Sequence, residues 1–191
     1  VVAETLGSRG APTPFIATVV MAPIAIALAG SKEQQSQWLP ALAEGSVVAG
    51  AAVSEAVGAR EGAQVEFDGS KLHGRSLFVL DFEADVYLVA DKHRALYLVE
   101  ADAPGLSRQS LTTIDNTRRV GELVFDNVPA QLLAGSSDPV VCARVIDAGR
   151  IMLAADTLGA AQTVLTRAVD YSKQRVQFGR AIGSFQAVKH M

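Results

Sequence analysis

The sequence feature that most constrains the fold is a long helical repeat of apolar residues that begins after Pro139. Apolar side chains recur every three or four residues, at Val141, Val145, Ala148, Met152, Ala155, Leu158, Leu165 and Val169. This spacing predicts one helix of about 34 residues, roughly 50 Å long. Such a helix is too long for the interior of a single 20.0 kDa globule, so we expect it to need partners along its length.

The central part of the chain has a different pattern. Between residues 46 and 135, apolar and polar side chains alternate in short runs separated by Gly, Asp and Asn, as in Asp68-Gly69 and Asp126-Asn127. A period of two with frequent turn residues predicts antiparallel strands. Acidic residues outnumber basic ones here, so we expect the sheet to have a solvated, acidic outer face. Helical and strand patterns are segregated along the chain, which argues against a βαβ sheet.

The first 45 residues are rich in Ala and carry few charges. Residues 15–29 are apolar all round and predict a buried helix. Ser31 and Gln34 have the spacing of a capping box, which satisfies the first free N–H groups of a helix. We therefore expect a second, short helix over residues 32–39 that stops before Pro40.

Composition excludes several classes of protein. Apolar residues make up 49% of the chain, which is enough for a core and excludes a disordered chain. The net charge of −3 gives no basis for binding nucleic acid. The longest apolar run contains Pro23 and is too short for a membrane span. We expect no signal peptide, and the single cysteine, Cys142, permits no internal disulfide, so we expect a cytoplasmic setting.

Some patterns imitate functional sites. Residues 69–76 have the outline of a phosphate-binding P-loop with Arg75 in the place of Lys, but a strand pattern follows them, so we expect a glycine-rich β-turn. Asp81, Glu83 and Asp85 have the spacing of one strand face and carry the oxygen ligands of a hard cation. No further ligands accompany them, and we expect a solvated strand edge. We predict no metal site.

The stretch with the richest chemistry is residues 171–186. Arg175, Phe178 and Gln186 place a guanidinium, an aromatic ring and a side-chain amide around a glycine break. A guanidinium suits phosphate oxygens, and an amide can bind an adenine edge through its donor and its acceptor. The same residues also fit a charged helix end at a subunit interface, and their chemistry alone favours neither interpretation.

This stretch resembles the signature of the acyl-CoA dehydrogenase flavoprotein family, which has Tyr…Arg-x-x-Phe-Gly…Gln at this spacing. Other parts of the chain resemble the family in the same order. Residues 30–45 are similar to the helix before its β domain, and Ala52-Val53-Ser54-Glu55 to its first flavin loop. Phe78-Val79-Leu80 stands where the family has Trp-Ile-Thr, and residues 124–129 match the exit from the β domain.

The resemblance implies an α+β fold with an N-terminal helical domain, a central antiparallel β domain and a C-terminal helical bundle. We therefore expect residues 1–45 to be the end of the N-terminal helical domain. Residues 46–135 would form the central β domain, and residues 136–191 the first helices of the C-terminal helical domain. The chain would then be a fragment that lacks both ends of the family's polypeptide.

The resemblance also implies a reaction, the α,β-dehydrogenation of an acyl-CoA thioester. A carboxylate would remove the α proton while the β hydrogen leaves as hydride to flavin N5. FAD would be the cofactor, acyl-CoA the substrate, and electron-transferring flavoprotein the electron acceptor. The family further implies lipid catabolism and an assembly of identical or homologous subunits, either a dimer or a tetramer.

Four residues would lie at the flavin ring by this resemblance. Val53 and Ser54 would meet the ring through backbone and hydroxyl, and Phe78 would cover it in place of Trp. Leu80 stands in the place of a Thr whose hydroxyl helps to hold the flavin, and loss of such a buried hydrogen bond costs about 1–3 kcal/mol. The loop that follows in the family, Pro-Gly-x-Gly-Ser-Asp, is altered and shortened at residues 56–60.

Four further residues would reach the FAD of a neighbouring subunit. Arg175, Gln177 and Gln186 would contact it, and Phe178 would pack beside them. A cofactor site shared across subunits would explain why the long apolar helix needs partners.

Fewer candidate residues are found for binding the substrate and for removing its proton. Asp147 and Arg150 match a family Asp-x-x-Arg pair near the acyl-CoA. The family's base comes from the C-terminal helices or from the position that Gly149 occupies, and glycine cannot take a proton, so we expect the base outside this segment. Leu80 and the altered loop leave a second interpretation open, a non-catalytic structural partner subunit of the same fold in a hetero-oligomer.

Overall fold

The structure is a computed structural model that describes residues 1–54, 58 and 62–190. The chain divides into two compact units. The first, called here the helical unit, combines Val1–Ala11 with Leu153–Met191. The second, called the sheet unit, is Pro12–Met152.

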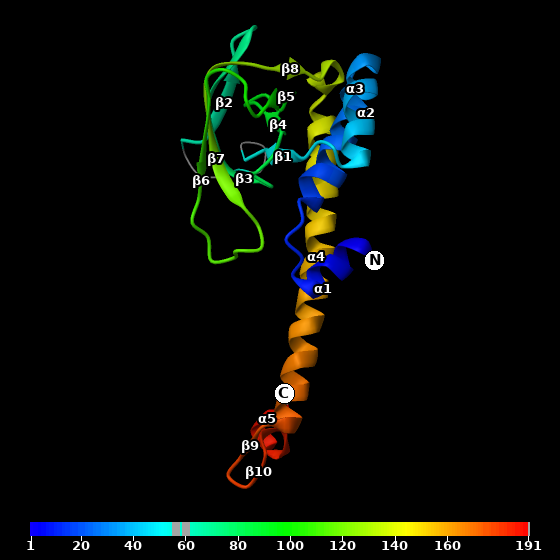
Figure 1. The fold of residues 1–191 in the computed structure, drawn as a ribbon, viewed down its shortest axis with the longest axis vertical. Helices are drawn as coiled ribbons and strands as arrows, with labels where there is room; N and C mark the ends of the chain where they lie inside the picture. The colour runs from blue at the N-terminus through cyan, green and yellow to red at the C-terminus, as the bar shows by residue number, and fades with distance from the viewer. Residues whose placement is uncertain (55–57, 59–61, 191) are drawn as a thin grey trace. The chain divides into compact units, whose positions relative to one another are not determined.

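The sheet unit contains helices and one large sheet (Figure 1). Its helices are η1 (Phe15–Met21), α2 (Ala22–Ala29), α3 (Lys32–Glu44), η3 (Ala134–Ser137) and the first part of α4 (Pro139–Gln174). Its strands are β1 (Ala49–Ala52), β2 (Gln64–Phe67), β3 (Lys71–Leu80), β4 (Val86–Ala90), β5 (Leu96–Glu100), β6 (Leu106–Ser110), β7 (Val120–Pro129) and β8 (Gln131–Leu132). The α+β class predicted from the sequence is confirmed.

The strands lie in the order β6-β7-β3-β1-β4-β5-β8, and β2 pairs with β3. Every pair is antiparallel except β1 with β4, which run parallel. This exception corrects the purely antiparallel expectation. β3 and β4 lie on either side of β1, and the short loop between them reverses the chain direction. Because β3 is antiparallel to β1, β4 must therefore be parallel to it.

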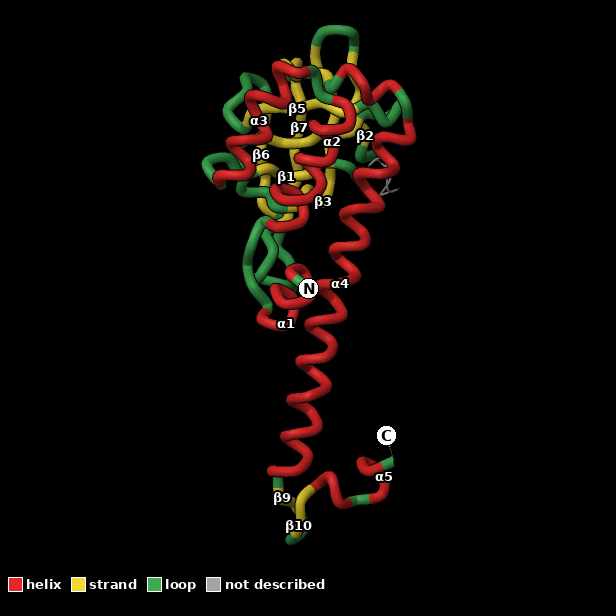
Figure 2. The backbone as a smooth tube through the Cα atoms, turned by 90° about the vertical axis from the view of Figure 1, so that its right-hand side faces the viewer, coloured by secondary structure: helices red, strands yellow, loops and turns green. Residues whose placement is uncertain are grey.

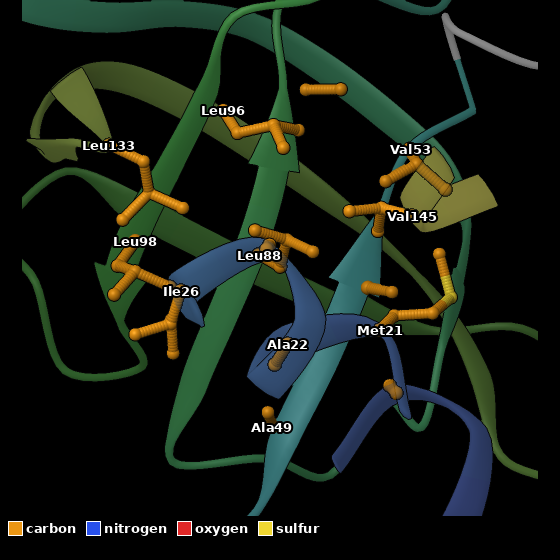
Figure 3. Packing of buried hydrophobic residues seen from close by; sticks show 14 of the residues in the cluster. Met21, Ala22, Ile26, Ala49, Val53, Leu88, Leu96, Leu98, Leu133 and Val145 are labelled. Carbon is orange, nitrogen blue, oxygen red and sulfur yellow. The ribbon is translucent and has the colours of Figure 1, made fainter. Parts of the chain in front are cut away.

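Two apolar cores lie on the two faces of the sheet. In the first, Ile26 of α2 packs with Leu88 of β4 and Leu98 of β5, and Val145 of α4 completes the cluster (Figure 3). The second contains side chains of β2, β3, β4, β5 and β7, including Tyr87, and it lies where the sheet curls over itself. Burial of one such aliphatic or aromatic side chain stabilises the fold by roughly 1.5–3 kcal/mol.

The middle of the sheet is buried on both faces. Along β4, Val86 and Leu88 belong to the core beneath the helices, whereas Tyr87 and Val89 belong to the other core. The expectation of a solvated outer face is therefore wrong for β4 and for most of β5. The sequence shows alternating apolar and polar residues, but the curl of the sheet covers the face that was expected to be solvated.

Residues 15–29 are helical throughout, as predicted, but the first half has wide π-type turns. The amide of Ala22 donates to the carbonyl of Ala17, five residues earlier. Pro23 lies at the first turn of α2, where its missing N–H does least harm. Gly30 follows in extended conformation, and a Cβ there would lie 2.6 Å from the Ile26 carbonyl oxygen.

The capping box is confirmed. The Ser31 hydroxyl accepts from the Gln34 amide at 3.2 Å, and the Gln34 side chain accepts from the Ser31 amide at 2.9 Å. The predicted stop at Pro40 is wrong, since α3 continues to Glu44. Burial of Leu42 holds the last turn against the core, so tertiary packing outweighs the hydrogen bond that proline removes.

The glycine-rich segment forms a turn only at Gly69 and Ser70, and the expectation is wrong for residues 71–76, which belong to β3. The Asp68 carboxylate accepts from the amides of Ser70 and Lys71, both at 2.8 Å, and strand β3 follows at once. A P-loop would require a helix there.

The three carboxylates after β3 are in a loop and not on a strand. Asp81 accepts from the amide of Ala17 at 3.0 Å, and Asp85 accepts from the amide of Val48 at 2.8 Å. The expectation of a strand edge is therefore wrong for all three carboxylates, although Glu83 and Asp85 are solvent-exposed as expected. Within the described ranges, no group of three or more His, Cys, Asp or Glu side chains is placed to hold a metal ion.

The helical unit consists of α1 (Val2–Arg9), the remainder of α4, β9 (Val176–Gln177), β10 (Arg180–Ala181), η4 (Ile182–Ser184) and α5 (Gln186–Lys189). α4 is continuous over 36 residues, close to the predicted length (Figure 2). α1 lies against it at Gly7 and Gly159, where the two backbones approach closely. Apolar side chains of α4 such as Leu158 and Val164 are exposed in this chain.

Taken over the residues that the structure describes, none of the helices has both the length and the hydropathy needed to cross a membrane.

Candidate functional site

The first group of candidate residues lies where β1 ends beside β3. Ala51 of β1 pairs with Leu80 of β3, and the chain then continues through Val53 to Ser54. The Ser54 hydroxyl accepts from the amide of Leu77 at 3.2 Å. The structure therefore brings together two sequence segments, residues 53–54 and 78–80, that the family resemblance assigned to one flavin ring.

The exposed member of this group is Phe78. The register of β3 against β7 shifts between Ser76 and Val79, and Phe78 lies within this β-bulge. Its φ of 55° is uncommon for a residue other than glycine, and its side chain is 46% exposed. Bulges beside functional sites commonly turn one side chain out of the sheet pattern. Here the bulge presents a flat aromatic ring at the surface, next to the buried Val79 of the same strand.

The remaining members are less accessible. Val53 and Ser54 are buried, and Leu80 is partly buried against the core beneath the helices. Leu80 offers an aliphatic side chain where the resemblance expects a hydroxyl. Of the loop that follows, residues 55–57 and 59–61 lie outside the described residues, so the expected shortening of that loop stays a prediction.

The second group lies in the helical unit, on the turn and short elements that follow α4. The amide of Arg175 donates to the Tyr171 carbonyl, and its own carbonyl accepts from Ile182, which folds the chain back on itself. The side chains of Arg175, Gln177, Phe178 and Gln186 are all exposed.

An aromatic cluster supports this turn. Phe178 is 92% exposed with a φ of 51°, and its ring meets that of Phe185 edge-on at 6.2 Å. The Arg180 guanidinium lies 4.0 Å from the centre of the Phe185 ring, a cation–π contact. The turn therefore presents aromatic, amide and cationic groups to the solvent on one short segment.

The third group is the pair on α4 within the sheet unit. Arg150 donates to Asp147 at 3.2 Å, and both side chains are about two-thirds exposed. Exposed pairs of this kind contribute at most about 1 kcal/mol to stability.

The position between them cannot carry a base. Gly149 faces Met21 of η1 so closely that a Cβ would lie 2.9 Å from the methionine sulfur. A longer acidic side chain would have to displace Met21, which is buried in the core. The expectation that the base lies outside this segment stays a prediction.

Cys142 is a buried, free thiol in the core beneath the helices. Burial raises the pKa of this thiol above its ordinary value, which disfavours the thiolate. We assign it no chemical role.

One residue that sequence reasoning missed is Ser76. It is 1% exposed, and its hydroxyl lies 2.8 Å from that of Ser54. The signal was its position, because Ser76 occupies an inward place in the alternation of β3 where an apolar residue is usual.

Comparisons with known proteins point to one family. The family model described as "Acyl-CoA dehydrogenase, C-terminal domain" matches residues 140–191. An acyl-CoA dehydrogenase of Bacillus subtilis is 32% identical over 185 residues, which cover 83% of this chain and 48% of the relative. The chain thus spans about half the length of the curated relatives that it matches.

Solved structures agree with this result. One solved structure, described as a variant of the "Tcur3481-Tcur3483 steroid ACAD", is 36% identical to this chain with a TM-score of 0.84. The match covers 98% of this chain and 53% of that one. A glutaryl-CoA dehydrogenase from Mycobacterium smegmatis, solved in complex with FADH2, is 25% identical with a TM-score of 0.74, over 92% of this chain and 49% of that one.

Proposed function

Because the chain belongs to the acyl-CoA dehydrogenase family, we propose that the protein containing it dehydrogenates an acyl-CoA thioester between the α and β carbons, using FAD. The observation that carries the proposal is the hydrogen bond between Ser54 and Leu77, which brings the turn after β1 to the bulge that contains Phe78. The similarity of the chain to a dehydrogenase solved with FADH2 supports the choice of cofactor.

The residues present suit the two ends of a flavin dinucleotide. Phe78 offers an exposed ring face, and the backbone and hydroxyl at Val53 and Ser54 offer polar groups beside it. When bound, FAD supplies the acceptor for the two electrons that leave the substrate. The protein's part is to hold a flat ring system, limit its contact with water and orient the thioester.

The exposed turn after α4 suits the dinucleotide end. Arg175 can pair with phosphate oxygens, and Gln177 and Gln186 can offer amide donors and acceptors, with Phe178 packing beside them. We propose that these four side chains serve the FAD of a neighbouring subunit. We further propose that Asp147 and Arg150 lie near the acyl-CoA.

The base that removes the α proton is proposed to lie outside this segment, because Gly149 has no side chain and Met21 fills the space beside it. An electron-transferring flavoprotein as acceptor, a cytoplasmic location and a dimer or tetramer complete the proposal.

One observation favours a second function. Leu80 has no hydroxyl with which to hold a flavin, and this fits a structural partner subunit that lacks activity of its own.

The visible spectrum of the purified full-length protein separates the two proposals. We expect a yellow protein that reduces an artificial electron acceptor when acyl-CoA is added. A colourless protein that never turns over acyl-CoA would contradict catalysis. Flavin binding only after a second, different subunit is added would favour the structural partner.

A further inference from the structure

The bulge in β3 has an unusual support. Ser76 pairs with Leu123 and Val79 pairs with Gly121, so two residues of β3 face the single residue Glu122 of β7. Within the bulge, the amide of Leu77 donates to a side-chain oxygen, the hydroxyl of Ser54. The conformation that exposes Phe78 is therefore tied to a hydroxyl in the turn that follows β1.

That hydroxyl has a partner of its own. The oxygens of Ser54 and Ser76 lie 2.8 Å apart, and the two residues are 4% and 1% exposed. A buried hydroxyl is unfavourable unless it forms a hydrogen bond. Ala or Val would suit an inward strand position better than Ser76 if packing alone mattered. The serine is explained by the hydrogen bond that it makes to Ser54.

We propose that Ser76 is a positioning residue that fixes the Ser54 hydroxyl and, through it, the Leu77–Phe78 bulge of the cofactor site. A lone serine side chain can occupy three staggered rotamers. A bond to Ser76 together with the one from the Leu77 amide selects a single rotamer. The pair holds two hydroxyl protons and uses one between its oxygens; among the described residues the other proton has no acceptor, so it can be donated to a bound ligand.

The proposal rests on the proposed function in one respect, the identity of that ligand as FAD. The support of the bulge itself requires no cofactor. Two separate measurements therefore test the two parts, amide hydrogen exchange of the flavin-free protein and FAD affinity.

The variants Ser76→Val and Ser76→Thr in the full-length protein test the role of the hydroxyl most directly. Their side chains have the same shape, so both strain the buried site equally, and only Thr retains a hydroxyl. Ser76→Ala provides a variant without added bulk. Ser70→Ala is the matched control, because it removes a serine hydroxyl from the exposed turn that precedes the same strand.

We expect exchange of the Leu77 amide, measured by mass spectrometry with fragmentation, to quicken about 2- to 10-fold in Ser76→Ala. The Val variant should exchange faster than the Thr variant by a similar factor, and Ser70→Ala should match the parent. FAD affinity, measured by flavin fluorescence, should fall in the same order.

Equal exchange of the Leu77 amide in the Val and Thr variants, and no change in Ser76→Ala, would overturn the proposal. Faster exchange with unchanged FAD affinity would overturn the role of Ser76 toward the cofactor. If the parent protein binds no FAD, the proposed function fails, and the exchange measurement still decides whether Ser76 supports the bulge.

Discussion

Replacement of Asp81 tests how the first helix of the sheet unit is attached to the sheet. Helix η1 begins after Pro14, which has no side chain able to cap it. The Asp81 carboxylate, from the loop after β3, accepts from the amide of Ala17 at 3.0 Å. Asp81 has a φ of 51°, a conformation that Asp and Asn tolerate better than Ala. We expect Asp81→Ala to destabilise the protein and Asp81→Asn to be well tolerated.

The expected destabilisation by Asp81→Ala is the sum of two contributions to the free energy of unfolding. Leaving the buried Ala17 amide without an acceptor costs roughly 1–3 kcal/mol. Placing Ala in the left-handed region costs about 1 kcal/mol more. The sum, roughly 2–4 kcal/mol, corresponds to a lower Tm by roughly 4–16 °C for a domain of this size. Asn retains an oxygen acceptor and tolerates the conformation, so its change should stay small.

The pH dependence gives a second readout. Burial raises the pKa of the Asp81 carboxyl, although the Ala17 amide and the charge of Arg118 oppose the shift. A raised folded pKa means that this carboxyl contributes most to stability below about pH 4, the pKa of an unfolded Asp. The contribution is lost as the pH rises through the folded pKa. Asp81→Asn should therefore gain stability relative to the parent across that window.

Thermal unfolding of the parent and variants between pH 4 and pH 7 measures both effects. Glu83→Ala is the control in the same loop, because its ion pair with Arg119 is largely exposed and should contribute at most about 1 kcal/mol. If Asp81→Ala unfolds at the same temperature as Glu83→Ala, the reasoning is refuted. Equal damage from Asn and Ala would show that the negative charge, and not the acceptor, matters.

Three further outcomes are expected. Arg175→Ala should release FAD without unfolding the protein, whereas Arg167→Ala, which changes another exposed arginine, this one on α4, should retain FAD; flavin absorbance after gel filtration measures both. Ser31→Ala should lower the free energy of unfolding by about 1 kcal/mol in urea titration, because one half of the capping box is lost. Gly159→Ala should loosen α1 toward proteases, since its Cβ would lie 1.9 Å from the carbonyl oxygen of Glu4.

The sequence alone determined the features that depend on neighbouring residues. The Ser31 capping box, the Asp68 turn and the long α4 helix were predictable because their hydrogen bonds and periodicity act within a few residues. The family resemblance added the candidate residues 53–54 and 78–80. Their meeting beside the bulge required the strand order, which no local pattern contains.

The tertiary structure decided what depends on distant contacts. The Asp81 bond to Ala17 spans 64 residues, and the Ser54–Ser76 bond spans 22. α3 passes Pro40 because packing against the core offsets a lost hydrogen bond. For the Asp and Ser side chains, the sequence pattern would fit solvent equally well. Only the fold places a buried donor, acceptor or apolar surface beside each of these side chains. The free energy of that contact decides the structural role of the side chain.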